Sequence, residues 1–124
     1  MNKKMLNSLT KIARAIALAN LDHRKSYHVS IVISGKSIIA IGQNGHKTHT
    51  LNQIHGYKAD VIHSELDAFS KIRYRDGNFT LVNFRFNKNG QLRNSMPCKY
   101  CMPWCLEFFA EIWYSTDFGM KQLS

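Results

Sequence analysis

The chain has 124 residues, of which 44% are hydrophobic and 20% are charged. This length suits one domain with a hydrophobic core and excludes two ordinary ones, and the composition excludes a disordered chain. No apolar run approaches the ~20 residues that a membrane-spanning helix needs. Seventeen Lys and Arg against eight Asp and Glu give a formal net charge of +9, which favours anionic partners such as nucleotides or nucleic acid. We therefore expect a single domain over residues 1–124, without a membrane partner.

The cysteines and the N-terminus indicate the compartment. Three cysteines are too few, and odd in number, for a disulfide framework, whereas the close pair Cys98 and Cys101 is typical of metal binding or catalysis. The N-terminus starts basic, as a signal peptide does, but polar residues interrupt the apolar segment that would have to follow. We therefore expect an intracellular, cytoplasmic protein.

The first half of the chain predicts a helix followed by a β-hairpin. Apolar residues recur at intervals of three and four over residues 4–20, as on one face of an amphipathic helix. Two β-like runs, residues 27–33 and 37–41, are joined by a short link that contains Gly35, and such a link predicts a hairpin. The polar stretch 42–58 is long for a connection, and loops of this length are often functional.

The second half alternates helical and extended patterns. Residues 59–72 return to helical spacing, 79–86 form a β-like run, and 87–90 form a turn. Residues 98–109 suit a helix and 111–115 a final strand. The order predicts an α/β protein with helices packed on a mixed sheet. We expect antiparallel pairing in the hairpin and parallel pairing where a helix joins two strands.

Two short motifs bring together the residues that a catalytic zinc site needs. His63 and Glu65 stand at the start of one predicted helix, and Pro97, Cys98 and Cys101 at the start of another. Zinc binds imidazole nitrogen and thiolate sulfur, and a catalytic site leaves its fourth position for water. A bound zinc lowers the pKa of that water, and a carboxylate outside the metal's ligand shell can then move protons.

The spacing within the first motif restricts its geometry. Residues two apart on a helix differ by about 200°, so His63 and Glu65 can face one ion only where the backbone is irregular, at a helix start. The combination H-x-E followed by P-C-x-x-C is typical of zinc-dependent deaminases. The alternatives are coincidental core residues and a structural zinc site, for which Cys105 would be the fourth ligand. We expect Cys105 to be a buried small residue instead.

Around these motifs, from about residue 29 to 119, the chain resembles the cytidine deaminase-like superfamily. Residues 63–68, H-S-E-L-D-A, are similar to the family's H-A-E-x-x-A helix start. The resemblance implies a three-layer α-β-α fold with a mixed central sheet of about five strands. It also implies one Zn²⁺ per chain held by His63, Cys98 and Cys101, with Glu65 as the catalytic proton carrier.

The resemblance extends to substrate contacts. Residues 41–45, I-G-Q-N-G, are similar to a segment of deoxycytidylate deaminases, which implies that Asn44 hydrogen-bonds a sugar or base; a simple turn is the alternative. In this family the backbone after the histidine ligand touches the base, which implies a contact from Ser64. Aromatic residues can enclose a base, and Trp104, Tyr114 and Phe118 are candidates by position.

Three features depart from the family pattern. Segment 87–94 lengthens the interval between the motifs and either closes over the pocket, with Arg93 near a phosphate, or forms a surface extension. Pro103 would break a helix that began at Cys98, so the cysteines can instead occupy a separate turn before a helix that starts near Met102. The polar stretch carries three histidines that could hold a second metal, although exposed residues or phosphate contacts fit better: His46, His49 and His55.

The implied reaction is hydrolytic deamination, in which water replaces the amino group of a ring. We expect cytosine to become uracil in a nucleotide or nucleoside, namely dCMP or (deoxy)cytidine. The alternative is a nucleic-acid base deaminase acting on tRNA adenosine or single-stranded cytosine, which the net charge favours. A non-catalytic zinc-binding module is a third class, against which the intact Glu65 argues. The resemblance also implies a homo-oligomer.

Overall fold

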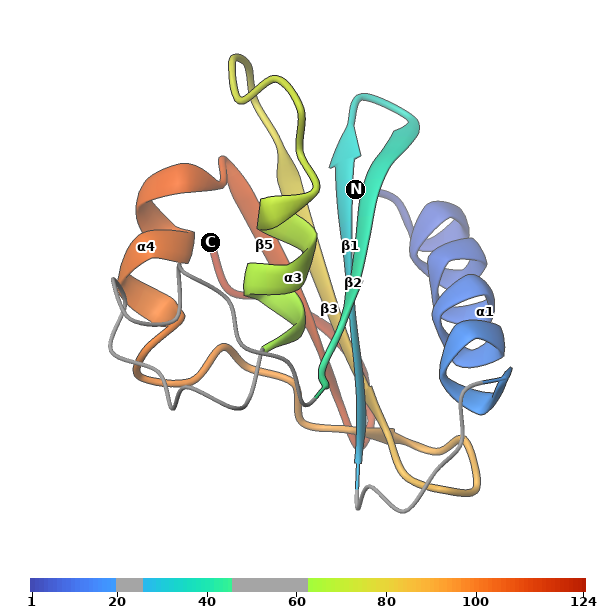
Figure 1. The fold of residues 1–124 in the computed structure, drawn as a ribbon. Coiled ribbons are helices and arrows are strands. Elements are labelled where there is room, and N and C mark those ends of the chain that lie inside the picture. Colours follow the sequence, from blue (N-terminus) through green and yellow to red (C-terminus); the bar gives the residue numbers. More distant parts are fainter. Residues whose placement is uncertain (20–25, 46–62) are drawn as a thin grey trace.

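The computed structural model describes residues 1–19, 26–45 and 63–124, which form a mixed sheet with helices on both faces (Figure 1). The first two strands, β1 (Tyr27–Ser34) and β2 (Ser37–Gln43), form an antiparallel hairpin. Gly35 adopts a φ of 63° in the turn between them, a conformation that only glycine reaches without strain. The hairpin and its antiparallel pairing confirm the sequence prediction.

The rest of the sheet is built on β3 (Thr80–Phe86). This strand pairs antiparallel with β1 on one side and parallel with β5 (Glu111–Thr116) on the other. A further strand, β6 (Gly119–Gln122), extends the edge, so the strand order is β2-β1-β3-β5-β6. The short β4 (Leu92–Arg93) pairs with the end of β3. The parallel β3–β5 pair, joined through a helix, is the arrangement expected from the sequence.

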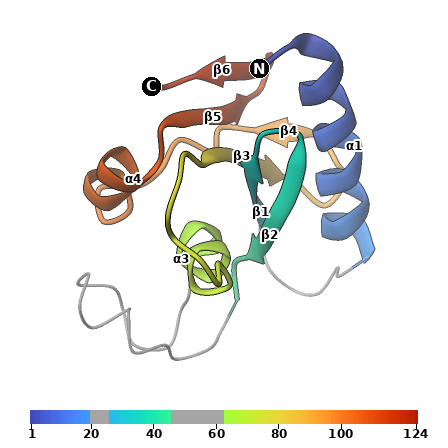
Figure 2. The same ribbon diagram turned by 90° about the horizontal axis from the view of Figure 1, so that it is seen from above.

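Helices cover both faces of this sheet, as Figure 2 shows from above. The amphipathic α1 (Lys3–Ala19) packs its buried Leu and Ala side chains on one face. The other face carries α3 (Ser64–Ser70) and α4 (Met102–Phe108). Because side chains alternate along a strand, each strand supplies both hydrophobic layers, one on each side of the sheet. The predicted three-layer α-β-α architecture is confirmed.

Gly42 allows α3 to lie directly on β2. A Cβ at this position would overlap the backbone of Ser64 and Ala68, so only glycine fits. The Asp67 carboxylate then accepts a hydrogen bond of 2.9 Å from the backbone N–H of Gln43, and it contacts Lys71 Nζ at 3.1 Å. These contacts bring the start of α3 to the end of the hairpin, where the candidate site lies.

The structure corrects the predicted bounds of two helices. Residues 59–62 lie outside the described residues, and His63 has an extended backbone, so the helix predicted over 59–72 starts only at Ser64; it ends at Ser70. The helix expected over 98–109 starts at Met102, with Pro103 in its first turn, where proline's missing N–H costs no hydrogen bond. The cysteines therefore occupy a separate turn, which was the alternative that Pro103 suggested.

Segment 87–94 forms a hairpin with the end of β3. Its tip lies against α1, where Arg14 Nε donates a 3.0 Å hydrogen bond to the carbonyl of Gly90. Arg93 forms an ion pair of 3.6 Å with Asp117 and does not line the pocket described below. The segment is therefore a surface extension rather than a cover for the pocket. Across residues 1–19, 26–45 and 63–124, every helix is too short or too polar to cross a bilayer.

Candidate metal centre and active site

Three predicted ligands meet where α3 begins and the 98–101 turn ends. His63 Nδ1 lies 3.5 Å from Cys98 Sγ and 3.7 Å from Cys101 Sγ, and all three ligand atoms fall within 4.8 Å of one another. A tetrahedral zinc with bonds of about 2.3 Å to sulfur and about 2.05 Å to nitrogen sets N and S about 3.5 Å apart. The spacing of these side chains therefore fits zinc.

The local backbone conformation directs the side chains of His63, Cys98 and Cys101 toward one point. His63 is the N-cap of α3 with φ −80° and ψ 149°, so its imidazole leaves the helix in a different direction from the residues that follow. The 98–101 turn is closed by hydrogen bonds of 3.1 and 2.8 Å from the N–H groups of Cys101 and Met102 to the Cys98 carbonyl. The tight turn places both sulfur atoms on the same side, facing His63.

The electrostatics of the cluster favour the ligand form of Cys98. Its pKa is lowered to about 3 by the hydrogen bond with Cys101, with a further contribution from His63 and from backbone N–H groups. Cys98 is therefore a thiolate at neutral pH, which is the form that binds zinc. The hydrogen bond that the His63 imidazole donates to the Cys98 sulfur in turn raises the pKa of His63.

Cys105 lies apart from this cluster. It is fully buried in the hydrophobic layer between α4 and the sheet, and burial raises the pKa of its thiol well above the ordinary value. Among the residues that the structure describes, the only group of at least three metal-binding side chains is the one formed by His63, Cys98 and Cys101. The predicted histidines of the polar stretch, His46, His49 and His55, lie outside the described residues. The described residues thus offer three protein ligands, the number typical of a catalytic zinc.

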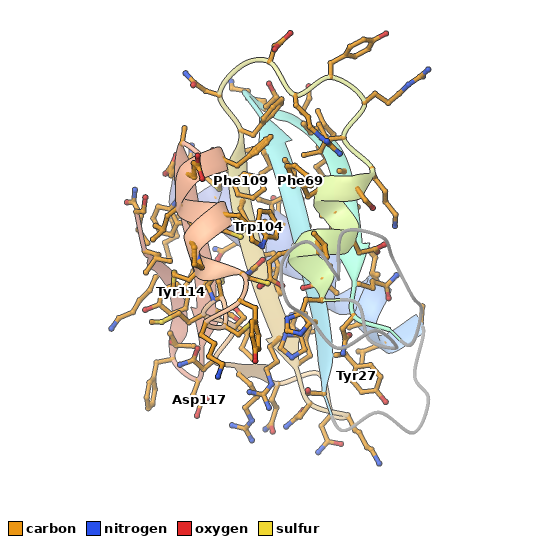
Figure 3. All side chains as sticks on the ribbon, turned by 60° about the vertical axis from the view of Figure 1, so that its left-hand side comes forward. Tyr27, Phe69, Trp104, Phe109, Tyr114 and Asp117 are labelled. Carbon is orange, nitrogen blue, oxygen red and sulfur yellow. The ribbon has the colours of Figure 1, made fainter. Side chains whose placement is uncertain are left out.

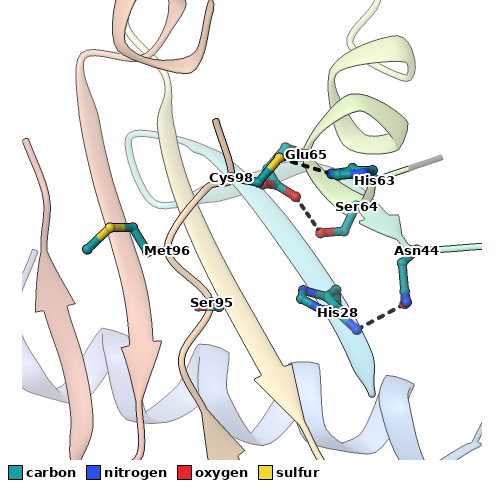
Figure 4. A pocket seen from close by; sticks show the side chains of 8 residues that line it. All are labelled: His28, Asn44, His63, Ser64, Glu65, Ser95, Met96 and Cys98. Carbon is teal, nitrogen blue, oxygen red and sulfur yellow. Dashed lines mark hydrogen bonds between the residues drawn. The ribbon is translucent and has the colours of Figure 1, made fainter. Parts of the chain in front are cut away.

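A pocket of about 190 Å³ opens beside the cluster (Figure 4). Glu65 lines it and is only 5% exposed, and its Oε1 accepts a 2.9 Å hydrogen bond from Ser64 Oγ. The structure therefore brings together Glu65, Ser64 and the cluster, as the sequence predicts. The pocket is lined by residues from four segments: His28, Asn44, His63, Ser64, Glu65, Ser95, Met96 and Cys98.

Asn44 lies in the pocket wall and connects the end of β2 to the start of β1 by hydrogen bonds. Its Oδ1 accepts a 3.0 Å hydrogen bond from the backbone N–H of His28, and its Nδ2 donates to the carbonyl of Ser26 at 3.3 Å. The residue therefore shapes the wall, and its predicted contact with substrate remains a prediction.

The aromatic candidates are not part of the pocket wall in the described chain; two of them, Trp104 and Tyr114, are labelled in Figure 3. Trp104 packs edge-on against Phe69, with ring centroids 5.2 Å apart, and Phe118 is fully exposed beyond β5. Tyr114 is buried on β5, next to Asn83 of β3 in the strand register. None of the three candidates is among the pocket-lining residues within the described chain. The substrate-binding role of Tyr114 remains a prediction.

The sequence prediction missed His28, Ser95 and Met96 as pocket residues. His28 alternates with the apolar residues of β1 that face α1, and this histidine in a mostly apolar strand is the signal that could have revealed it. Ser95 and Met96 precede the metal motif without a recognisable pattern. They reach the pocket because the chain returns there from the β4 hairpin.

We expect His28 to make stability depend on pH. Burial, followed by the charge of Arg85, lowers its pKa from 6.5 to about 4. Between these pH values the unfolded state binds a proton that the folded state does not, so stability is full above pH 6.5 and falls as the pH decreases toward 4. At about 1.4 kcal/mol per pKa unit, lowering the pKa from 6.5 to about 4 corresponds to a full loss of about 3.5 kcal/mol at low pH.

This contribution of His28 can be measured by urea unfolding of the wild type and His28→Gln at pH 7 and pH 4.5. Both proteins are studied with a zinc chelator present. The variant should lose less free energy of unfolding between the two pH values than the wild type loses. Equal losses in both proteins would show that His28 is not the residue responsible.

Comparison with solved structures identifies the fold. The chain is similar to the dCMP deaminase of cyanophage S-TIM5 in complex with dCMP and dUMP, at 20% identity over 92% of this chain and 82% of that one, with a TM-score of 0.61. It is also similar to the cytidine deaminases of Mycobacterium leprae (18% identity, 94% and 91% coverage, TM-score 0.59) and Mycobacterium tuberculosis (14% identity, 94% and 89% coverage, TM-score 0.59). No protein-family model and no curated protein sequence matches the chain. The chain therefore has the fold of these dCMP and cytidine deaminase structures, as the resemblance of its two motifs implies.

Proposed function

We propose that the protein is a zinc-dependent hydrolytic deaminase that converts cytosine to uracil in a nucleotide or nucleoside, dCMP or (deoxy)cytidine. The observation that carries this proposal is the buried Glu65 in a pocket beside three side chains spaced for zinc. A structural zinc site has no use for a carboxylate held in this way. The likeness to structures of dCMP and cytidine deaminases supports the same reaction.

In this reaction His63, Cys98 and Cys101 would hold the metal. A zinc ion bound there supplies a water molecule of lowered pKa as the nucleophile. Glu65 would accept one proton of the attacking water and deliver it to the ring nitrogen. It would then take the second proton from the hydroxyl group added to the ring carbon and deliver it to the amino group, which leaves as ammonia. The hydroxyl of Ser64 can both donate and accept, so it can contact Glu65 in its carboxylate form and in its acid form.

The remaining pocket residues suit recognition of the sugar or phosphate. His28 and Asn44 come from neighbouring strand ends and lie away from the ligand cluster in Figure 4. With a pKa of about 4, the His28 imidazole is neutral at physiological pH and can act as both donor and acceptor. The backbone of Ser64, at the start of α3, is the proposed contact to the base.

A polymer substrate is the second candidate, and the net charge of +9 favours it. Neutralisation of phosphates supplies most of the affinity for nucleic acid and makes it strongly dependent on salt. A tRNA adenosine or a cytosine in single-stranded nucleic acid would then be the target. Such a protein should retain oligonucleotides at low salt and release them steeply as salt increases.

A substrate panel distinguishes these functions. The zinc-loaded protein is incubated with cytosine and adenine nucleosides, with their monophosphates, and with short oligonucleotides, and the products are read by mass. Conversion of an amino group to a carbonyl in free cytosine compounds supports the first proposal. Conversion confined to oligonucleotides supports the second. A panel without any product, from protein that contains stoichiometric zinc, would contradict both and favour a non-catalytic module.

A further inference from the structure

A row of buried polar side chains, which we call the polar row, runs from Ser64 on α3 through Ser30 on β1 to Asn83 on β3. Ser64 Oγ lies 2.9 Å from Glu65 Oε1 and 2.8 Å from Ser30 Oγ, and Ser30 Oγ lies 2.7 Å from Asn83 Oδ1. Ser30, Ser64 and Asn83 are each at most 2% exposed. The polar row thus connects Glu65, the predicted proton carrier, to the two central strands β1 and β3.

These polar residues stand in an apolar layer. Ser30 and Asn83 are register partners on β1 and β3, on the face that α3 covers, and Val32 and Leu81 continue the same face as fully buried apolar residues. Burial of a hydroxyl and an amide is costly unless each is hydrogen-bonded. Packing alone would be satisfied by small apolar side chains at both positions. The presence of Ser30 and Asn83 instead indicates that their polar contacts have a functional role.

The contacts link the side-chain amide of Asn83 to the carboxylate of Glu65 through two hydroxyl groups. Asn83 Nδ2 donates to the carbonyl of Ser95 at 3.4 Å, which turns its Oδ1 toward Ser30. Ser30 has a single hydroxyl proton for its two acceptors, Asn83 Oδ1 and Ser64 Oγ. The Ser30 hydroxyl therefore donates to one of these acceptors at a time. In either arrangement the Ser30 oxygen lies beside Ser64 Oγ and restricts where the Ser64 hydroxyl can point.

We propose that Ser30 is a positioning residue that acts through the Ser64 hydroxyl to hold the Glu65 carboxylate at the reacting atoms. This inference rests on the proposed function, in which Glu65 moves protons. The carboxylate ends a flexible side chain, and a proton carrier works only within hydrogen-bond reach of its target. A small displacement of such a group lowers the turnover rate without weakening the binding of substrate.

The test is a double-mutant cycle of Ser30→Ala, Ser64→Ala and the double variant, assayed as zinc-loaded protein on the substrate found in the panel. We expect Ser30→Ala to lower kcat on the order of tenfold while KM changes by less than about twofold. Ser64→Ala should lower kcat at least as much. Because Ser30 acts through Ser64, the double variant should be no slower than Ser64→Ala alone.

Val29→Ala is the matched control. Val29 is the neighbour of Ser30 on β1 and is equally buried, but it faces α1. Its truncation destabilises the same strand without changing a residue of the polar row, so kcat should stay at the wild-type value below the unfolding temperature. If Ser30→Ala does not fold, Ser30→Cys fills a similar volume with a weak donor and should lower kcat in the same direction.

A crystal structure of zinc-loaded Ser30→Ala gives a readout that does not depend on activity. We expect a full zinc site and a Glu65 side chain that has moved or adopts several conformers. Wild-type kcat in Ser30→Ala, or additive losses of kcat in the double variant, would overturn the proposal. These outcomes are distinct from failure of the proposed function, which would show as a substrate panel without product. They are also distinct from failure of the role proposed for Glu65, which would show as wild-type turnover in Glu65→Gln.

Discussion

Glu65→Gln is expected to retain zinc and to lose turnover by a factor on the order of 10²–10⁴, which is the contribution of a positioned acid–base group. Glutamine has the same shape as glutamate, and its amide oxygen can still accept the hydrogen bond from Ser64. The variant should therefore fold and bind substrate normally. It cannot accept a proton from water or return one to the leaving amine, so the loss should appear in kcat rather than in KM.

The measurement is initial rate against substrate concentration, together with the zinc content of the same sample. Glu107→Gln is a suitable control because Glu107 is an exposed carboxylate on α4 that does not line the pocket. Its rate should equal that of the wild type. Turnover by Glu65→Gln at the wild-type rate would show that this carboxylate is not the proton carrier and would contradict the proposed mechanism.

His63→Ala is expected to lose zinc and activity together. With only the two thiolates left, the site lacks the ligand number of a stable zinc centre, and metal content after dialysis should fall from one per chain to background. Binding of a ligand to the folded state adds about 4 kcal/mol of stability when its concentration is a thousand times its Kd. A chelator should therefore lower the melting temperature of the wild type and leave that of His63→Ala unchanged.

Cys105→Ala provides the matched control for the ligand set. Cys105 is the third cysteine of the chain, but it lies in the hydrophobic layer and outside the cluster. Its truncation should lower stability through lost packing and leave zinc stoichiometric. Loss of zinc in Cys105→Ala would instead make this cysteine a fourth ligand and the site structural. Retention of zinc in His63→Ala would place the ligands elsewhere.

Much of the fold follows from local patterns in the sequence. The strand prediction for residues 27–33 depends on β-branched residues, and the hairpin depends on the short link that contains Gly35, so both are encoded within a few residues. The bounds of α3 could not be predicted in this way. Helical spacing runs past Ser70, and only the packing of α3 on Gly42 and the contacts of Asp67 determine where the helix lies.

The extra strands illustrate a second limit. The short β4 and the edge strand β6 have weak patterns of their own and form because β3 and β5 offer them hydrogen-bonding partners. Strand propensity is context-dependent for this reason. Ser30 and Asn83 were likewise unremarkable in the sequence, 53 positions apart, until strand register placed them side by side beneath Glu65.

By itself the sequence determined the chemistry of the candidate site: the residue types, their order, and the two spacings that place His63 with Glu65 and Cys98 with Cys101. Only the tertiary structure decided how those groups meet. Because the backbone is extended at His63 and residues 98–101 form a separate turn, the histidine nitrogen and the two cysteine sulfur atoms lie close enough to one another to bind one zinc ion. The physical reason is that residue type is a local property, whereas the distance between α3 and the 98–101 turn depends on how both pack against one sheet.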